Sequence, residues 1–248
     1  MNVHISHNFY GAHQLQHNLP YDFKDFCVIV VDVLRASTTI TTLLELCDEI
    51  YITDSIEDVE AQSFKDFIKV GERNGKKIED FDFGNSPLEI KLNGDNIISQ
   101  TTDGKSIILT TTNGTRVLKS ILSDNILIGS ITNAKYVADA AYKIAKENEK
   151  DILIIPCHRK GSFAIEDYIG AGLIAKYVLK NMDDKIYSEE LTPALNLVKS
   201  DWKSLIFNGS SANNLKNLGY HKDLIFCTSE NSQKSVGMFK DGKIVNIN

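Results

Sequence analysis

The chain has 248 residues, of which 42% are hydrophobic and 24% are charged, the proportions of a soluble globular protein rather than of a disordered or fibrous one. Its formal net charge of −6 argues against a general nucleic-acid partner, because such binders gain affinity by neutralising phosphates with Lys and Arg. The amino terminus has no signal-peptide pattern and no apolar run is long enough to cross a bilayer, so we expect a cytoplasmic protein with no membrane partner.

Four short aliphatic runs predict buried strands, and most of them are followed by a helical pattern. The runs cover residues 27–34 (CVIVVDVL), 106–112 (SIILTTT), 125–130 (NILIGS) and 151–157 (DILIIPC). Continuous apolarity without alternation indicates strands covered on both faces. Apolar residues at helical spacing then follow over 114–122, 133–150 and 164–182. This order predicts an α/β fold with a largely parallel or mixed sheet flanked by helices.

Two other segments have a different character. Residues 71–104 are rich in Gly, Asn, Asp and Pro and lack periodicity, which predicts a long loop with a functional role. The tail from residue 224 predicts a strand, a polar turn and a terminal hairpin around KDGK at 240–243. We expect one α/β unit over residues 1–248, or two similar, tightly packed halves that meet near residue 125.

Polar residues gather where the predicted strands end and the next helices begin. In open parallel sheets this edge is where ligands bind. Asp32 ends the first run, Arg35 follows in the turn, and Ser37 and Thr38 stand at a helix start, where free backbone N–H groups point outward. The same edge has further anion-binding candidates: Thr112, Asn113, Gly114, Thr115, His158, Arg159, Ser210 and Ser211. The alternative for each hydroxyl or amide is ordinary helix capping.

Five carboxylates could supply metal ligands at this edge: Asp32, Glu72, Asp82, Glu166 and Asp167. Hard oxygen ligands suit Mg²⁺, which usually keeps several waters and bridges one or two carboxylates to a substrate phosphate. The alternatives are structural. Glu166 and Asp167 fall in a predicted first helical turn, where the macrodipole favours negative charge without a metal, and Glu72 and Asp82 fit turns.

The sequence lacks the signature residues of three familiar classes of phosphate-binding or phosphate-cleaving protein. No GxxxxGK[ST] string occurs, so the chain has no phosphate-binding loop of the nucleotide triphosphatases. A haloacid-dehalogenase-type phosphatase needs an Asp two positions after the first, and that position is Leu34. A cysteine phosphatase built on Cys157 would need an Arg six positions later, where Phe163 stands.

An ordered set of motifs, spread over nearly the whole chain, resembles the 2-phosphosulfolactate phosphatases. The set is VDVLRASTTI, GERNG, FDFGNSP, TTTNGTR, GSITNA, EDYIGAG and GSSANNLKNLG. The resemblance implies an α/β fold peculiar to that family and a Mg²⁺-dependent phosphatase that converts 2-phospho-3-sulfolactate to 3-sulfolactate and phosphate, a step in making coenzyme M. By position it implies these site residues: Asp32, Arg35, Glu72, Asp82, Asn85, Asn113, Gly114, Thr115, Glu166 and Asp167.

We therefore expect Asp32, Arg35 and Glu166 to be catalytic, with Mg²⁺ held by Asp32 and other acidic residues while Arg35 and helix N–H groups stabilise the transition state. Asp32 could act as a metal ligand or as a nucleophile, and both roles stay open. The alternative functions are a phosphatase for another small phosphorylated carboxylic acid and a non-catalytic protein that binds an anionic metabolite. Helix 164–182 could pack in the core or form a homodimer contact.

Overall fold

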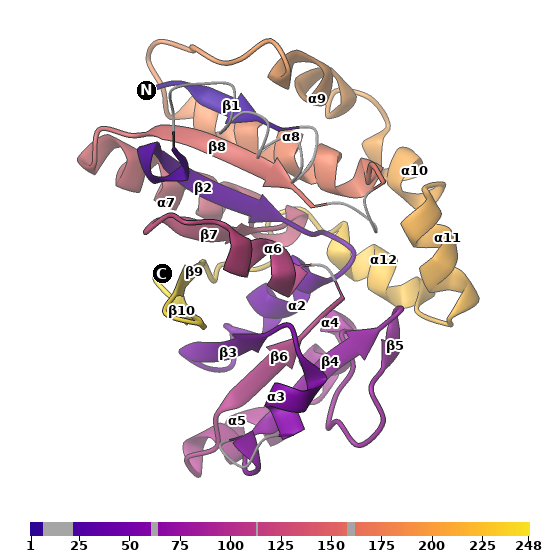
Figure 1. The fold of residues 1–248 in the computed structure, drawn as a ribbon. Helices are drawn as coiled ribbons and strands as arrows, with labels where there is room; N and C mark the ends of the chain where they lie inside the picture. Colours follow the sequence, from indigo (N-terminus) through magenta and orange to yellow (C-terminus); the bar gives the residue numbers. More distant parts are fainter. Residues whose placement is uncertain (7–21, 61–63, 113, 158–161) are drawn as a thin grey trace.

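The computed structural model describes residues 1–6, 22–60, 64–112, 114–157 and 162–248, and these build a single ten-stranded sheet with helices on both faces (Figure 1). The strands are β1 (Val3–Ile5), β2 (Phe26–Val31), β3 (Glu49–Thr53), β4 (Ile68–Arg73), β5 (Lys76–Lys77), β6 (Ile107–Thr110), β7 (Ile126–Gly129), β8 (Asp151–Pro156), β9 (Gly237–Lys240) and β10 (Lys243–Asn246). Their order across the sheet is β1-β8-β2-β7-β9-β10-β3-β6-β4-β5.

Two parallel blocks make up most of this sheet, β1-β8-β2-β7 on one side and β3-β6-β4 on the other. The C-terminal hairpin β9–β10 lies between them and pairs antiparallel with β7 and with β3. This hairpin and the four aliphatic strands confirm the predictions from sequence. Strands from both sides of residue 125 share the sheet, and the division into halves stays a prediction.

The helices are α2 (Ala36–Leu43), α3 (Ile56–Glu60), α4 (Pro87–Leu92), α5 (Gly94–Thr102), α6 (Gly114–Ser120), α7 (Ala134–Glu147), α8 (Ile165–Lys180), α9 (Leu191–Leu197), α10 (Trp202–Phe207), α11 (Ser210–Asn217) and α12 (His221–Cys227). Two short 3-10 helices, η1 (Phe23–Asp25) and η3 (Ile131–Asn133), complete the set. The predicted helices over 114–122, 133–150 and 164–182 are confirmed as α6, α7 and α8. No helix in the described ranges is both long and apolar enough to cross a membrane.

Side-chain alternation along β2 explains why both faces of the sheet are covered. Ile29 and Val31 point into a core shared with α7, α8 and α9, whereas Val28 and Val30 point into a second core shared with α2, α4, α5 and α6. All six residues of β2 are buried. Because successive strand side chains face opposite sides, an uninterrupted aliphatic run is what a strand between two helical layers requires.

Two predictions about segments were wrong. Residues 71–104 are not one long loop, since they contain β5, α4 and α5. Ser86 caps α4 by accepting a hydrogen bond from the Glu89 N–H at 3.1 Å, and Pro87 begins the helix, which is where proline is best tolerated. The tail from residue 224 begins with α12 rather than a strand. Its buried positions, from Asp223 to Thr228, are spaced three and four apart.

Helix α8 lies close to β2 because Gly170 has no side chain at the contact. A Cβ on Gly170 would lie 2.7 Å from Val33 Cγ2 and 3.1 Å from Val31 Cγ1. We expect Gly170→Ala to force α8 away from β2 and to lower the free energy of unfolding by about 1–3 kcal/mol, the usual effect of overpacking.

Thermal unfolding measures this effect, and a shift of about 2–4 °C per kcal/mol is expected for a chain of this size. Gly94→Ala is the matched control, because its added Cβ would lie 3.4 Å from Leu46 Cδ2, an ordinary contact. Equal melting temperatures for the two variants would contradict the steric argument.

Candidate active site

A cavity of about 250 Å³ opens at the edge where β2, β4, β6 and β8 end. Figure 1 shows α10, α11 and α12 on the side toward which the arrowheads of β2, β4 and β8 point. The lining residues come from six segments: Asp32, Leu34 and Arg35 after β2; Glu72, Asn74 and Gly75 at the β4–β5 turn; Asn85 before α4; Thr112 after β6; Ala164, Glu166 and Asp167 at the start of α8; Ser211, Asn214 and Leu215 of α11. The predicted edge is therefore where the pocket lies.

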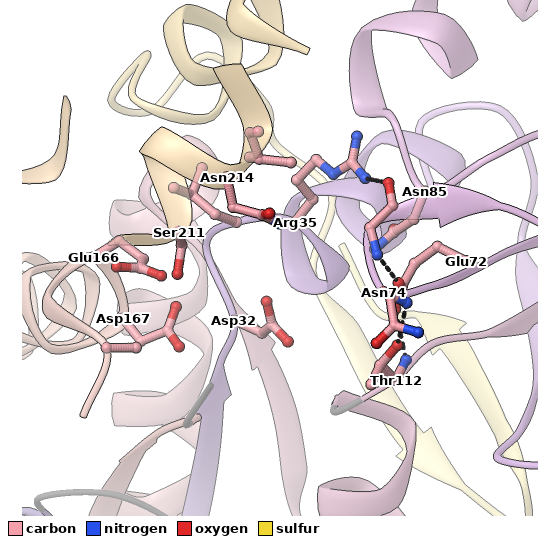
Figure 2. Close-up of a pocket in the computed structure, with 14 residues that line it drawn as sticks. Asp32, Arg35, Glu72, Asn74, Asn85, Thr112, Glu166, Asp167, Ser211 and Asn214 are labelled. Atoms are coloured by element: carbon pink, nitrogen blue, oxygen red, sulfur yellow. Dashed lines mark hydrogen bonds between the residues drawn. The ribbon is translucent and has the colours of Figure 1, made fainter. Parts of the chain in front are cut away.

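Three carboxylates form the acidic wall of this pocket: Asp32, Glu166 and Asp167. Figure 2 shows Asp32 between the two α8 carboxylates and the side that carries Glu72 and Thr112. Glu166 and Asp167 are each only 4% exposed. The Val33 N–H donates to Asp167 Oδ1 at 2.8 Å, whereas Glu166 has no hydrogen-bonding or ionic partner in the described part of the chain. Glu166 is thus a buried carboxylate that faces a cavity.

Burial and mutual repulsion favour the protonated forms of two of these groups. Burial is the main cause that raises the pKa of Asp32 from 3.8 to about 7. A hydrogen bond from the Ala36 N–H opposes this shift, the charges of Glu166 and Glu72 add to it, and the charge of Arg35 opposes it. The pKa of Asp167 is also raised well above its usual value, first by burial and then by Asp32 and Glu166. A cation between these groups would relieve the repulsion.

Glu72 occupies the opposite wall and fixes the backbone there. Its Oε2 accepts the Gly75 N–H and its Oε1 accepts the Thr112 N–H, each at 2.6 Å. The Thr112 hydroxyl in turn accepts the Asn74 N–H at 3.4 Å. Glu72 therefore ties the β4–β5 turn to the end of β6. Its predicted role as a metal ligand stays a prediction.

Arg35 lines the pocket, but protein groups hold its guanidinium. Its Nη1 donates to Asp223 Oδ2 and its Nη2 donates to the Gly75 carbonyl, both at 2.8 Å. The guanidinium carbon lies 4.2 Å from the centroid of the Tyr220 ring, a cation–π contact. The side chains of Arg35 and Asp223 are each 2% exposed. Arg35 thus has a fixed orientation at the rim of the acidic wall.

Several predicted substrate-binding hydroxyls make internal hydrogen bonds and do not line the pocket. Ser37 Oγ accepts the Asp32 N–H at 2.9 Å, and Thr38 Oγ1 donates to the Val33 carbonyl at 2.9 Å. Thr115 Oγ1 donates to the Thr111 carbonyl one turn back, at 3.0 Å. Ser210 is exposed on α11 and does not line the pocket, whereas its neighbour Ser211 does. Ser37, Thr38 and Thr115 thus use their hydroxyls within the protein, and a substrate-binding role for all four residues stays a prediction.

Asp82 is also not part of the pocket. Phe81 and Phe83 on either side of it are buried, so Asp82 points outward, where its Oδ2 accepts the Lys69 N–H at 2.7 Å. The sequence FDF alternates like a strand, and that alternation separates Asp82 from the other carboxylates. Gly114 begins α6, as expected for a residue at a helix start. Three other predicted residues, Asn113, His158 and Arg159, lie outside the described residues.

Asn85, a predicted substrate-binding residue, lines the pocket, and its role in binding stays a prediction. The residue is 5% exposed, and its Oδ1 has no hydrogen-bond partner among the described residues. A buried polar atom of this kind is costly unless a ligand or water satisfies it. Sequence reasoning missed other residues of the site: Asn74, Gly75, Asn214, Leu215 and Asp223. Only the turn-forming GERNG string could have indicated Asn74 and Gly75.

The residues at the acidic wall suit a hard divalent cation. Within the described ranges, no three His, Cys, Asp or Glu side chains are arranged as a ready metal site. Mg²⁺ does not require one, because it usually binds one or two carboxylates and keeps its waters. Asp32 and Glu166, for which the described residues provide no partner, supply those carboxylates, and a cation would offset the burial that raises the pKa of Asp32. The donor set therefore fits Mg²⁺.

Comparison with known proteins agrees with this geometry. The family model described as 2-phosphosulpholactate phosphatase matches residues 13–242. A 2-phosphosulfolactate phosphatase from Methanocaldococcus jannaschii is 54% identical over 87% of this chain and 89% of its own length. One from Methanothermobacter thermautotrophicus is 35% identical over 87% and 88%, and a probable one from Clostridium novyi is 34% identical over 89% and 92%. This chain therefore belongs to the 2-phosphosulpholactate phosphatase family.

Proposed function

We propose that the protein is a Mg²⁺-dependent phosphatase that hydrolyses 2-phospho-3-sulfolactate to 3-sulfolactate and phosphate. Family membership over most of the chain supports the reaction. The observation that carries the proposal is a set of three carboxylates, the partly buried Asp32 and the buried Glu166 and Asp167, facing a cavity of about 250 Å³ beside an arginine. This volume suits a small ligand rather than a polymer.

The charge of the pocket supports a cation as part of the reaction. Four of the lining residues are acidic, and Arg35, the one basic residue that the described lining contains, is already paired with Asp223. An ester with phosphate, sulfonate and carboxylate groups would be repelled by such a wall. When bound, Mg²⁺ would reverse the local charge and neutralise the phosphoryl oxygens. Asp32 and Glu166, with Asp167 beside them, are the residues that would hold it.

The protein's own groups then have separable roles. Arg35 presents the N–H groups not used by Asp223 and Gly75 to an anionic group of the substrate. Ser211 and Asn214 on α11 form the polar part of the wall beside Leu215, where a second anionic group could be bound. The Asn85 amide, whose buried oxygen finds no partner in the described part of the chain, would orient a bound water or hydroxyl.

Phosphate release in the presence and absence of metal tests this function. We expect 2-phospho-3-sulfolactate to be hydrolysed with Mg²⁺ present and turnover to fall by at least about 10³-fold when a chelator removes the metal. Readdition of Mg²⁺ should restore the rate. Binding of the ester without turnover in either condition would instead favour a metabolite-binding protein. Faster turnover of another phosphorylated carboxylic acid would reassign the substrate.

The attacking group is tested separately. During turnover, borohydride would reduce an aspartyl-phosphate on Asp32 to homoserine with release of phosphate, whereas direct attack by water on the substrate leaves Asp32 unchanged. Mass spectrometry of the peptide that contains Asp32 distinguishes the two routes.

In the cell, we place the protein in the cytoplasm and its reaction in the making of coenzyme M, so loss of the gene should lower the coenzyme M content.

A further inference from the structure

Asp223 holds Arg35 although it does not itself line the pocket. The residue lies on α12, near the C-terminal end of the chain, and its Oδ2 accepts Arg35 Nη1 at 2.8 Å. Its other oxygen, Oδ1, accepts the hydroxyl of Ser86, the cap of α4, at 2.8 Å. Asp223 is 2% exposed. A partner on each oxygen fixes the plane of this carboxylate and, through it, the direction of the guanidinium.

The choice of partner by Arg35 needs an explanation. Asp32, Glu72 and Glu166 line the same pocket as Arg35 and carry the same charge as Asp223. In a poorly solvated site, a guanidinium beside several carboxylates would be expected to pair with one of them. Yet within the described residues the ion pair that Arg35 makes is the one with Asp223, and its second anchor is a neutral carbonyl, that of Gly75.

We propose that Asp223 is a positioning residue of this active site: it neutralises and anchors Arg35, and thereby keeps Asp32 and Glu166 free to hold a divalent cation. The inference rests on the proposed function for the presence of that cation. Without Asp223, the guanidinium would turn to the acidic wall and compete with the metal for the same oxygens. With Asp223, the positive charge stays at the rim, where an anionic ligand can meet it.

Equilibrium binding of Mn²⁺, followed by electron paramagnetic resonance, tests this role without any substrate. Asp223→Asn keeps the shape of the side chain but leaves Arg35 unpaired, so the dissociation constant should rise about tenfold, the effect of one added charge a short distance away. Arg35→Gln removes the competing charge and leaves Asp223 negative, so the dissociation constant should fall. The double variant should return close to the wild-type value.

Opposite shifts of the Mn²⁺ dissociation constant in the two single variants distinguish this role from a purely structural one. If the pair only supported the fold, both variants would weaken Mn²⁺ binding, and the double variant would not recover it. Asp139→Asn is the matched control, since Asp139 forms an exposed ion pair with Lys135 at 2.7 Å on α7, and we expect its Mn²⁺ affinity to equal that of the wild type. Should Asp223→Asn fail to fold, as judged by thermal unfolding, the Mn²⁺ dissociation constant of Arg35→Gln tests the proposal by itself. A fall supports it, and a rise or no change overturns it.

The outcomes also distinguish this inference from the proposed function. An unchanged Mn²⁺ affinity in the folded Asp223→Asn variant, or shifts of the same sign in both single variants, would overturn the role of Asp223 and leave the phosphatase activity untouched. A wild-type protein that bound no Mn²⁺ would overturn both that role and the proposed metal dependence. Turnover at saturating Mg²⁺ adds a second readout: kcat should fall in Asp223→Asn, because the guanidinium is no longer held in place.

Discussion

Replacing Asp32 by Asn is expected to lower the turnover number by about 10³-fold or more, in the range seen when a metal ligand or nucleophile is removed from an active site. The change keeps the size of the side chain and an oxygen that can accept the Ala36 N–H, a bond of 3.3 Å in the wild type. Only the negative charge is lost. Both roles that we consider for Asp32, metal ligand and nucleophile, require that charge.

Asp82→Asn is the matched control for this experiment. It makes the same chemical change at a carboxylate that sequence analysis had grouped with Asp32 but that lies exposed outside the pocket. The amide oxygen can still accept the Lys69 N–H, so we expect a turnover within about a factor of two of the wild type. Phosphate release from both variants, measured at saturating Mg²⁺, tests whether Asp32 takes part in the reaction. A residual rate for Asp32→Asn within tenfold of the wild type would exclude Asp32 from the chemistry.

The sequence was sufficient to predict the edge of the sheet where the candidate pocket lies, because the topology determines that edge. Aliphatic runs predicted strands, parallel strands end at one edge, and polar residues that directly follow those strands meet there. Asp32 after β2, Thr112 after β6, and Glu166 and Asp167 after β8 all line one pocket for this reason. This argument needs only the order of the elements and no knowledge of side-chain geometry.

The same reasoning does not show which polar side chains line the pocket and which ones bind nearby backbone groups. Ser37, Thr38 and Thr115 stand at helix starts as predicted, but nearby backbone groups occupy their hydroxyls. A hydroxyl in that position satisfies a backbone group or a ligand equally well, and sequence cannot distinguish the two. Asp82 lies outside the pocket for another reason, since the buried aromatic residues on both sides of it turn it to the surface.

Long-range partners could not be predicted at all. Asp223 contacts Arg35 across 188 positions of sequence, and its segment was expected to lead into a strand. Leu224 to Cys227 form an apolar run that fits a short strand, and only tertiary packing shows that the buried positions follow a helical period. Asn214 belongs to α11, but nothing in its local sequence indicates that this helix lies over the pocket.

The metal-free protein is expected to become less stable as pH rises from about 4 to about 7, relative to its Asp32→Asn variant. Folding raises the pKa of Asp32 from 3.8 to about 7, mainly by burial and also through the charges of Glu166 and Glu72. The folded protein therefore holds a proton that the unfolded chain has released within this range, so the free energy of unfolding falls as pH increases. Above pH 7 the difference in the free energy of unfolding between the two proteins approaches roughly 4 kcal/mol. This corresponds to a difference in melting temperature of about 10 °C.

Thermal unfolding in the presence of a chelator, at several pH values, measures this dependence as the difference between the wild type and Asp32→Asn. The variant should be the more stable protein near pH 8, although it is expected to be nearly inactive, and the two should converge near pH 4. Asp82→Asn should follow the wild-type curve, because Asp82 is exposed. Adding Mg²⁺ should stabilise the wild type at high pH and have little effect on Asp32→Asn. If the melting temperatures of the wild type and Asp32→Asn changed in parallel with pH, the raised pKa would not belong to the Asp32 carboxylate.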